Sequence, residues 1–71
     1  MNTNASYHIV VNGRLDERWL GWFEGHSVDY LDTEKTMIAL KDVDQPALFG
    51  VLNRIRDLGL ELISVQKDDS P

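Results

Sequence analysis

Apolar and polar positions repeat along this chain with two different periods, and the changes of period predict its elements. A period of two predicts a strand, and a period of 3.6 predicts a helix. Six elements follow in the order strand, helix, strand, strand, helix, strand. Their predicted ranges are 7–11, 16–24, 26–31, 35–41, 44–59 with both caps included, and 60–67.

The second predicted helix has the clearest pattern. Asp44 has a side chain suited to an N-cap, and Pro46 follows in the first turn, where a missing N–H costs nothing. Gly59 is suited to end the helix. One apolar stripe joins these ends: Leu48, Val51, Leu52, Ile55 and Leu58.

The first predicted helix, at residues 16–24, is short and aromatic. Trp19 and Trp22 share one stripe, while Gly21 at its centre costs about 1 kcal/mol relative to alanine. A helix of this length needs packing to form. Both tryptophans are therefore expected in the core, or one is exposed as an anchor for a partner.

The faces of the strands predict the order of the sheet. Residues 7–11 and 35–41 are apolar on both faces, which favours central strands, whereas 26–31 alternates as an edge strand does. The element order predicts an α+β, ferredoxin-like βαββαβ fold: a four-stranded antiparallel sheet with two helices on one face. That topology places the first and third strands centrally, in agreement with their composition.

Two helices shelter one face of such a sheet, yet the strands carry apolar residues toward both. We expect the uncovered face to bind a protein partner or a second copy in a homodimer. A one-residue bulge reverses the faces, and scattered apolar residues on a wet face are also ordinary. The candidate residues on this face are Val10, Ile38, Leu40, Ile63 and Val65, or their counterparts.

Composition limits the remaining possibilities. The 71 residues allow one domain, expected at 7–67, with a disordered N-terminus at 1–6 and a polar tail at 68–71. Twelve acidic and seven basic residues give a net charge of −5, which argues against nucleic acid and anionic membranes. No apolar run is long enough to span a bilayer. The chain has no cysteine, so a cytoplasmic location is expected.

Candidate catalytic and metal-binding chemistry is sparse. His8 and His26 have no further histidine or cysteine at ligand spacing, so neither a metal nor a cofactor is expected. No nucleophile, base and orienting group are placed together by the sequence. We therefore expect a non-enzymatic protein.

Two resemblances add expectations. The segment Trp19–Phe23 and the ending from Asp44-Gln45 through Arg54-Ile55 to Ser64-Val65 resemble short bacterial proteins of uncharacterised function, over about residues 7–66. This resemblance implies no activity.

The Asp44-x-Pro46-x-Leu48 helix start, with its following glycine and strand, is similar to ACT domains, which are small ferredoxin-like regulatory modules. In ACT domains this start follows the first strand, whereas here it precedes the second helix. The resemblance implies an alternative function as a small-molecule sensor, with a ligand near Asn12, Gly13 and Arg14.

Overall fold

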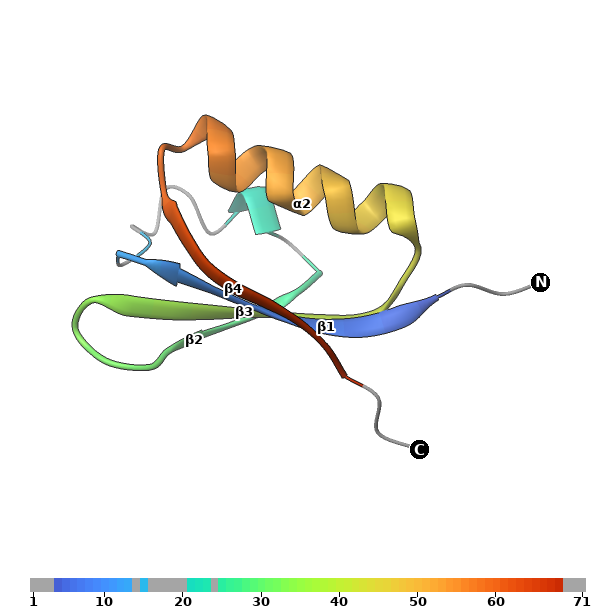
Figure 1. The fold of residues 1–71 in the computed structure, drawn as a ribbon, viewed down its shortest axis with the longest axis horizontal. Helices are drawn as coiled ribbons and strands as arrows, with labels where there is room; N and C mark the ends of the chain where they lie inside the picture. The colour runs from blue at the N-terminus through green and yellow to red at the C-terminus, as the bar shows by residue number, and fades with distance from the viewer. Residues whose placement is uncertain (1–3, 14, 16–20, 24, 69–71) are drawn as a thin grey trace.

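The fold is a four-stranded sheet with one α-helix laid across it (Figure 1). A computed structural model describes residues 4–13, 15, 21–23 and 25–68, apart from the side chain of Trp22. Its elements are β1 (Ala5–Asn12), the 3-10 helix η1 (Gly21–Phe23), β2 (Ser27–Tyr30), β3 (Lys35–Val43), α2 (Gln45–Asp57) and β4 (Glu61–Asp68).

The strands are antiparallel in the order β2-β3-β1-β4. The prediction that the first and third strands are central is confirmed. β2 and β4 are the two edge strands, with four and eight residues respectively. α2 contacts β3 and β4, the neighbours of β1 on either side, and so lies above β1 on one face of the sheet (Figure 1).

The predicted βαββαβ fold with two helices is wrong. Within the described residues there is one α-helix, α2. Most of the helix predicted at 16–24 lies outside the described residues, and its described part, Gly21–Phe23, is a single 3-10 turn. Gly21 lowers helix propensity at this point, and 3-10 geometry is the usual form of such short pieces. A hydrogen bond from the His26 N–H to the Phe23 carbonyl, at 3.0 Å, then closes the turn.

The predicted helix between Asp44 and Gly59 is confirmed. The Asp44 carboxylate accepts a hydrogen bond from the Ala47 N–H at 2.9 Å, and Pro46 is in the first turn. Gly59 has φ +74°, a conformation that favours glycine and ends the helix. Beyond it, the Leu60 N–H donates to the Ile55 carbonyl at 3.2 Å, which directs the chain into β4.

The core lies between α2 and the face of the sheet beneath it. Because paired residues of an antiparallel sheet share a face, the pairs Ile9–Ile38 and Tyr7–Leu40 place all four side chains toward α2. The remaining buried apolar residues come from β1, the segment before β2, and the helix: Val11, Leu15, Phe23, Leu48, Val51 and Ile55. Tyr30 secures the edge of this core, since its hydroxyl donates to the Leu15 carbonyl at 2.8 Å.

The N-terminal boundary differs from the prediction. Ala5 and Ser6, expected in a disordered segment, belong to β1. The Ser6 hydroxyl accepts a hydrogen bond from the Asp42 N–H at 3.1 Å, close to the register irregularity between Ala5 and Tyr7. Pairing with β3 therefore orders the chain two residues earlier than its apolar pattern indicates.

Candidate functional site

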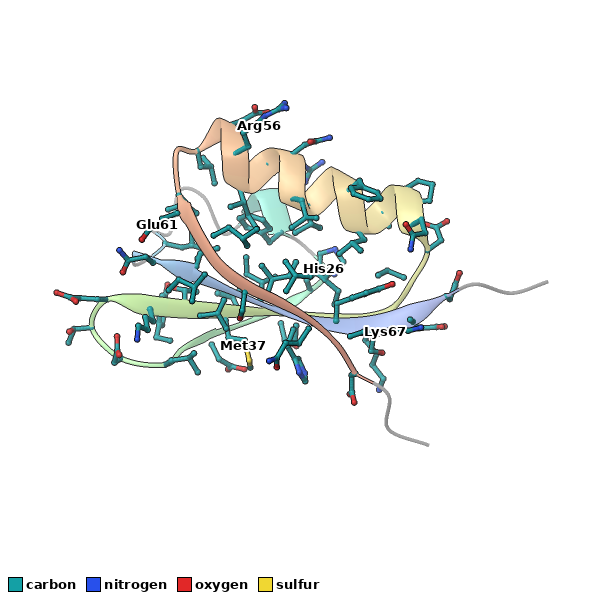
Figure 2. The ribbon with its side chains drawn as sticks, viewed as in Figure 1. His26, Met37, Arg56, Glu61 and Lys67 are labelled. Atoms are coloured by element: carbon teal, nitrogen blue, oxygen red, sulfur yellow. The ribbon has the colours of Figure 1, made fainter. Side chains whose placement is uncertain are left out.

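The sheet face turned away from α2 has a narrow apolar strip. Val10 pairs with Met37, and both are half-buried, as is Ala39. Met37 points away from α2 (Figure 2). The rest of this face, as the strand registers place it, is polar: His8, Asn12, Ser27, Asp29, Lys35, Ser64 and Gln66.

Ile38 and Leu40 are not on this open face. Their side chains are 0% and 1% exposed and lie under α2. Of the five candidates for the open face, Val10 lies there by its register, half-buried. The other two, Ile63 and Val65, belong to β4, where the surface has a different character.

β4 forms an exposed apolar edge. Among the described residues its only strand partner is β1, so its outer edge is unpaired. Leu62, Ile63 and Val65 are 46%, 47% and 38% exposed. Leu62 pairs with Val11 and Val65 pairs with Ile9, two residues that are fully buried. Leu62 and Val65 therefore continue the core face outward, beyond the part of the sheet that α2 covers.

A register shift brings Leu62 and Val65 to the same face. Val11 pairs with Leu62 and Val10 pairs with Ser64, so Ile63 is an extra residue in β4. A bulge of this kind interrupts the alternation of faces. A strand without a bulge would place Leu62 and Val65 on opposite faces, so the expectation of strictly alternating faces is wrong in this part of β4.

The exposed apolar surface extends from β4 to the side of α2. Phe49 is 55% exposed and Leu52 is half-buried, and both lie on one flank of the buried stripe of the helix. The connection β3–α2–β4 joins two parallel strands, and such crossovers are right-handed, which turns this flank toward β4. We call Phe49, Leu62, Ile63 and Val65 the β4 edge patch.

The charged side chains of β4 lie toward its two ends and not at its centre. Glu61 and Lys67 lie toward opposite ends of the strand (Figure 2). The Asn12 side-chain amide donates to the Glu61 carboxylate at 3.2 Å. From Leu62 to Gln66 the strand has no charged side chain. The centre of the edge is therefore suited to a neutral, apolar partner.

The alternative small-molecule site is at residues 12–14, and its described residues make hydrogen bonds to other parts of the fold. The Gly13 N–H donates to the Glu34 carbonyl, and the Gly13 carbonyl accepts from the Thr36 hydroxyl at 2.7 Å. The Asn12 amide binds Glu61, as described above, and Arg14 lies outside the described residues. These bonds hold the turn between β1 and the following segment, and ligand binding there stays a prediction.

The tryptophan cluster is only partly described. Trp19 lies outside the described residues, and Trp22 belongs to η1 with a side chain outside the description. Phe23, from the same cluster, is 1% exposed and packs in the core.

The described residues contain no group of three or more histidine, cysteine, aspartate or glutamate side chains that could hold a metal ion. They also contain no helix long and apolar enough to cross a membrane. The cytoplasmic location stays a prediction.

The fold defines a small mixed α/β domain in which the longer edge strand of the sheet, β4, has the β4 edge patch. Residues 6–66 match the model of the family described as Domain of unknown function (DUF8691), and the chain belongs to this family. No curated protein and no solved structure matches the chain.

Proposed function

We propose that this protein is a non-enzymatic protein-interaction module and that it binds its partner through the β4 edge patch. The observation that carries this proposal is the exposure of Leu62, Ile63 and Val65 on an unpaired edge strand. Proteins usually protect such an edge with a short strand, charges, proline or a bulge, and of these β4 has a bulge at Ile63 and charges at its ends. β4 has eight residues, no proline, and no charge from Leu62 to Gln66.

The chemistry of the edge indicates how a partner binds. An extended segment that adds to β4 forms backbone hydrogen bonds along the strand, which provide affinity with little sequence dependence. Specificity then comes from the side chains beside the strand. Leu62 and Val65 lie on the helix side, with Phe49 above them as an aromatic contact of the type enriched in binding hot spots.

A site-specific cross-linker in living cells tests this function. A photoreactive side chain at Gln66, which is exposed on β4, is expected to form a discrete cross-linked species. The same group at Asn53, on the outer surface of α2, is the matched control and is expected to form none.

The substitution Val65→Lys, made in the protein that carries the cross-linker at Gln66, tests whether the cross-linked species depends on the β4 edge patch. A charge in the apolar edge is expected to reduce cross-linking at least tenfold. Cross-linking that is absent at Gln66, or equal at Gln66 and Asn53, would contradict the proposed function.

A further inference from the structure

We infer that the partner of the β4 edge patch is a second copy of this chain, paired antiparallel through β4 so that two sheets become one of eight strands. This inference rests on the proposed function and names its partner. The two-fold axis runs through the seam, perpendicular to the sheet. Both α2 helices then lie on the same side of the joined sheet, one over each half.

The spacing of the helices favours a second copy over an isolated peptide. α2 lies above β1, so three strand spacings of about 4.8 Å separate the two helices, about 14 Å in all. Directly packed helices are about 8–10 Å apart. The two helices are therefore too far apart to pack directly, and side chains fill the space between them. Phe49, Leu62 and Val65 from each copy face this space. A bare strand would cover β4 but leave Phe49 in water.

The charge of the chain is compatible with self-association only at this kind of surface. Two copies that each carry a net charge of −5 repel one another over most of their surfaces. The stretch Ser64–Gln66 is uncharged, so two such stretches approach around Val65 without opposing carboxylates.

The size of the seam is close to the lower limit for a specific interface. An apolar patch of this kind covers on the order of a few hundred Å² per copy. Together with the paired backbones, it approaches the roughly 1,000 Å² that a specific interface needs. A small domain with a limited core also gains buried apolar surface by pairing.

The side chains of the regular part of β4, after the bulge at Ile63, favour one register of the pairing. Ser64 and Gln66 lie on the open face, because they pair with Val10 and His8, whereas Val65 lies on the helix face. Opposed residues must share a face, which a two-fold axis at Val65 or at Gln66 satisfies for the residues next to the axis. The axis at Val65 is favoured because it opposes two apolar side chains, whereas the axis at Gln66 opposes Val65 to the partner's Lys67. Val65 then opposes the partner's Val65, Ser64 opposes the partner's Gln66, and Ile63 opposes the partner's Lys67. Leu62 opposes the partner's Asp68, and within the described part of β4 no like charges are directly opposed.

Cysteine cross-linking of the full chain tests both the partner and the register, and the natural sequence has no cysteine to interfere. Opposed residues in an antiparallel pair have Cα atoms about 4.5–5.5 Å apart, within the range that a disulfide spans. Val65→Cys is therefore expected to form a disulfide-linked dimer under mild oxidation. Gln66→Cys is the matched control: its copies are offset by two residues, beyond about 7 Å, and are expected to stay unlinked.

Light scattering of the unmodified protein is measured beside the cross-linking. The expected mass is twice that of the chain at high micromolar concentration. Val65→Lys is expected to weaken association at least tenfold, while Leu31→Lys, at an exposed apolar position outside β4, leaves it unchanged. Circular dichroism establishes that each variant is folded.

The outcomes separate this inference from the proposed function. A monomer at all concentrations, or equal cross-linking of the Val65→Cys and Gln66→Cys proteins, overturns self-association. If a monomeric protein still cross-links through Gln66 in cells to a chain of different mass, the interaction edge stands and the second copy is wrong. If Gln66 cross-links to nothing, both ideas fail.

Discussion

Two glycines of this chain have opposite effects on the backbone. Gly13 has φ +119°, a conformation that residues with a Cβ adopt only under strain. A Cβ at this position would meet Leu60 at 3.6 Å, an ordinary contact, so the strain comes from the backbone alone. Gly50 lies in the middle of α2, and a Cβ there would meet nothing within 4 Å.

Alanine substitutions at these glycines are expected to shift stability in opposite directions. Gly13→Ala lowers the free energy of unfolding by about 1 kcal/mol or more, because of the positive φ. Gly50→Ala raises it by about 0.5–1 kcal/mol, because alanine is the better helix former. Urea denaturation of both variants at one protein concentration measures the difference. A stabilised Gly13→Ala protein would contradict the described turn.

At the scale of elements, the sequence contained much of the information for α2 and little for the segment before β2. Asp44, Pro46 and Gly59 are local signals, and each acts through its own backbone, so their effect is readable without a tertiary structure. In the segment around Gly21, by contrast, the burial of Phe23 depends on a sheet distant in sequence. Periodicity alone therefore predicts a helix where the described part is a single 3-10 turn.

The N-cap of α2 gives a prediction for that element. Asp44→Ala removes the acceptor of the Ala47 N–H and is expected to lower the free energy of unfolding by about 1 kcal/mol. Asp44→Asn keeps an oxygen at the same place and is expected to retain most of that stability. Chemical denaturation monitored by the helical signal measures both, and an alanine variant as stable as the asparagine variant would argue against the cap.

The candidate site could be predicted only in part, because the sequence does not show which residues of β3 and β4 the helix covers. The sequence indicates an excess of apolar strand residues, but it does not indicate the bulge at Ile63 that shifts the faces of β4. It also cannot separate Ile38, beneath the helix, from Val65, beyond the helix, because both are β-branched residues in apolar strands. The position of α2 over β1 makes that distinction.

Substitutions in β3 and β4 are expected to reveal this difference. Ile38→Ala leaves a cavity in the core and is expected to cost about 2–5 kcal/mol. Val65→Ala removes a partly exposed side chain and is expected to cost less than about 1 kcal/mol in the monomer, measured at low micromolar concentration. Similar costs at both positions would contradict the described faces.

At the scale of the whole molecule, pairing through β4 links stability to concentration. A partner that binds only the folded state raises the apparent stability by mass action, and in the proposed dimer that partner is the protein itself. Each tenfold rise in concentration adds up to about 1.4 kcal/mol to the unfolding free energy of the dimer. For a domain of this size, the Tm is then expected to rise by several degrees.

Thermal unfolding over two decades of concentration measures this dependence. Val65→Lys is the control, and its Tm is expected to stay constant. A Tm of the unmodified protein that is independent of concentration would contradict pairing in the tested range.

The two edges of the sheet differ, and the difference determines how far assembly proceeds. β4 is long and apolar, whereas β2 has four residues and carries the charged Asp29. Open-ended polymerisation would require two mutually cohesive edges on every molecule. In the proposed dimer β4 pairs only with its own copy, so the first pairing uses this edge and leaves two β2 edges of four residues, each with the charged Asp29. If the chain pairs in this way, the difference between the two edges is expected to prevent the growth of fibres.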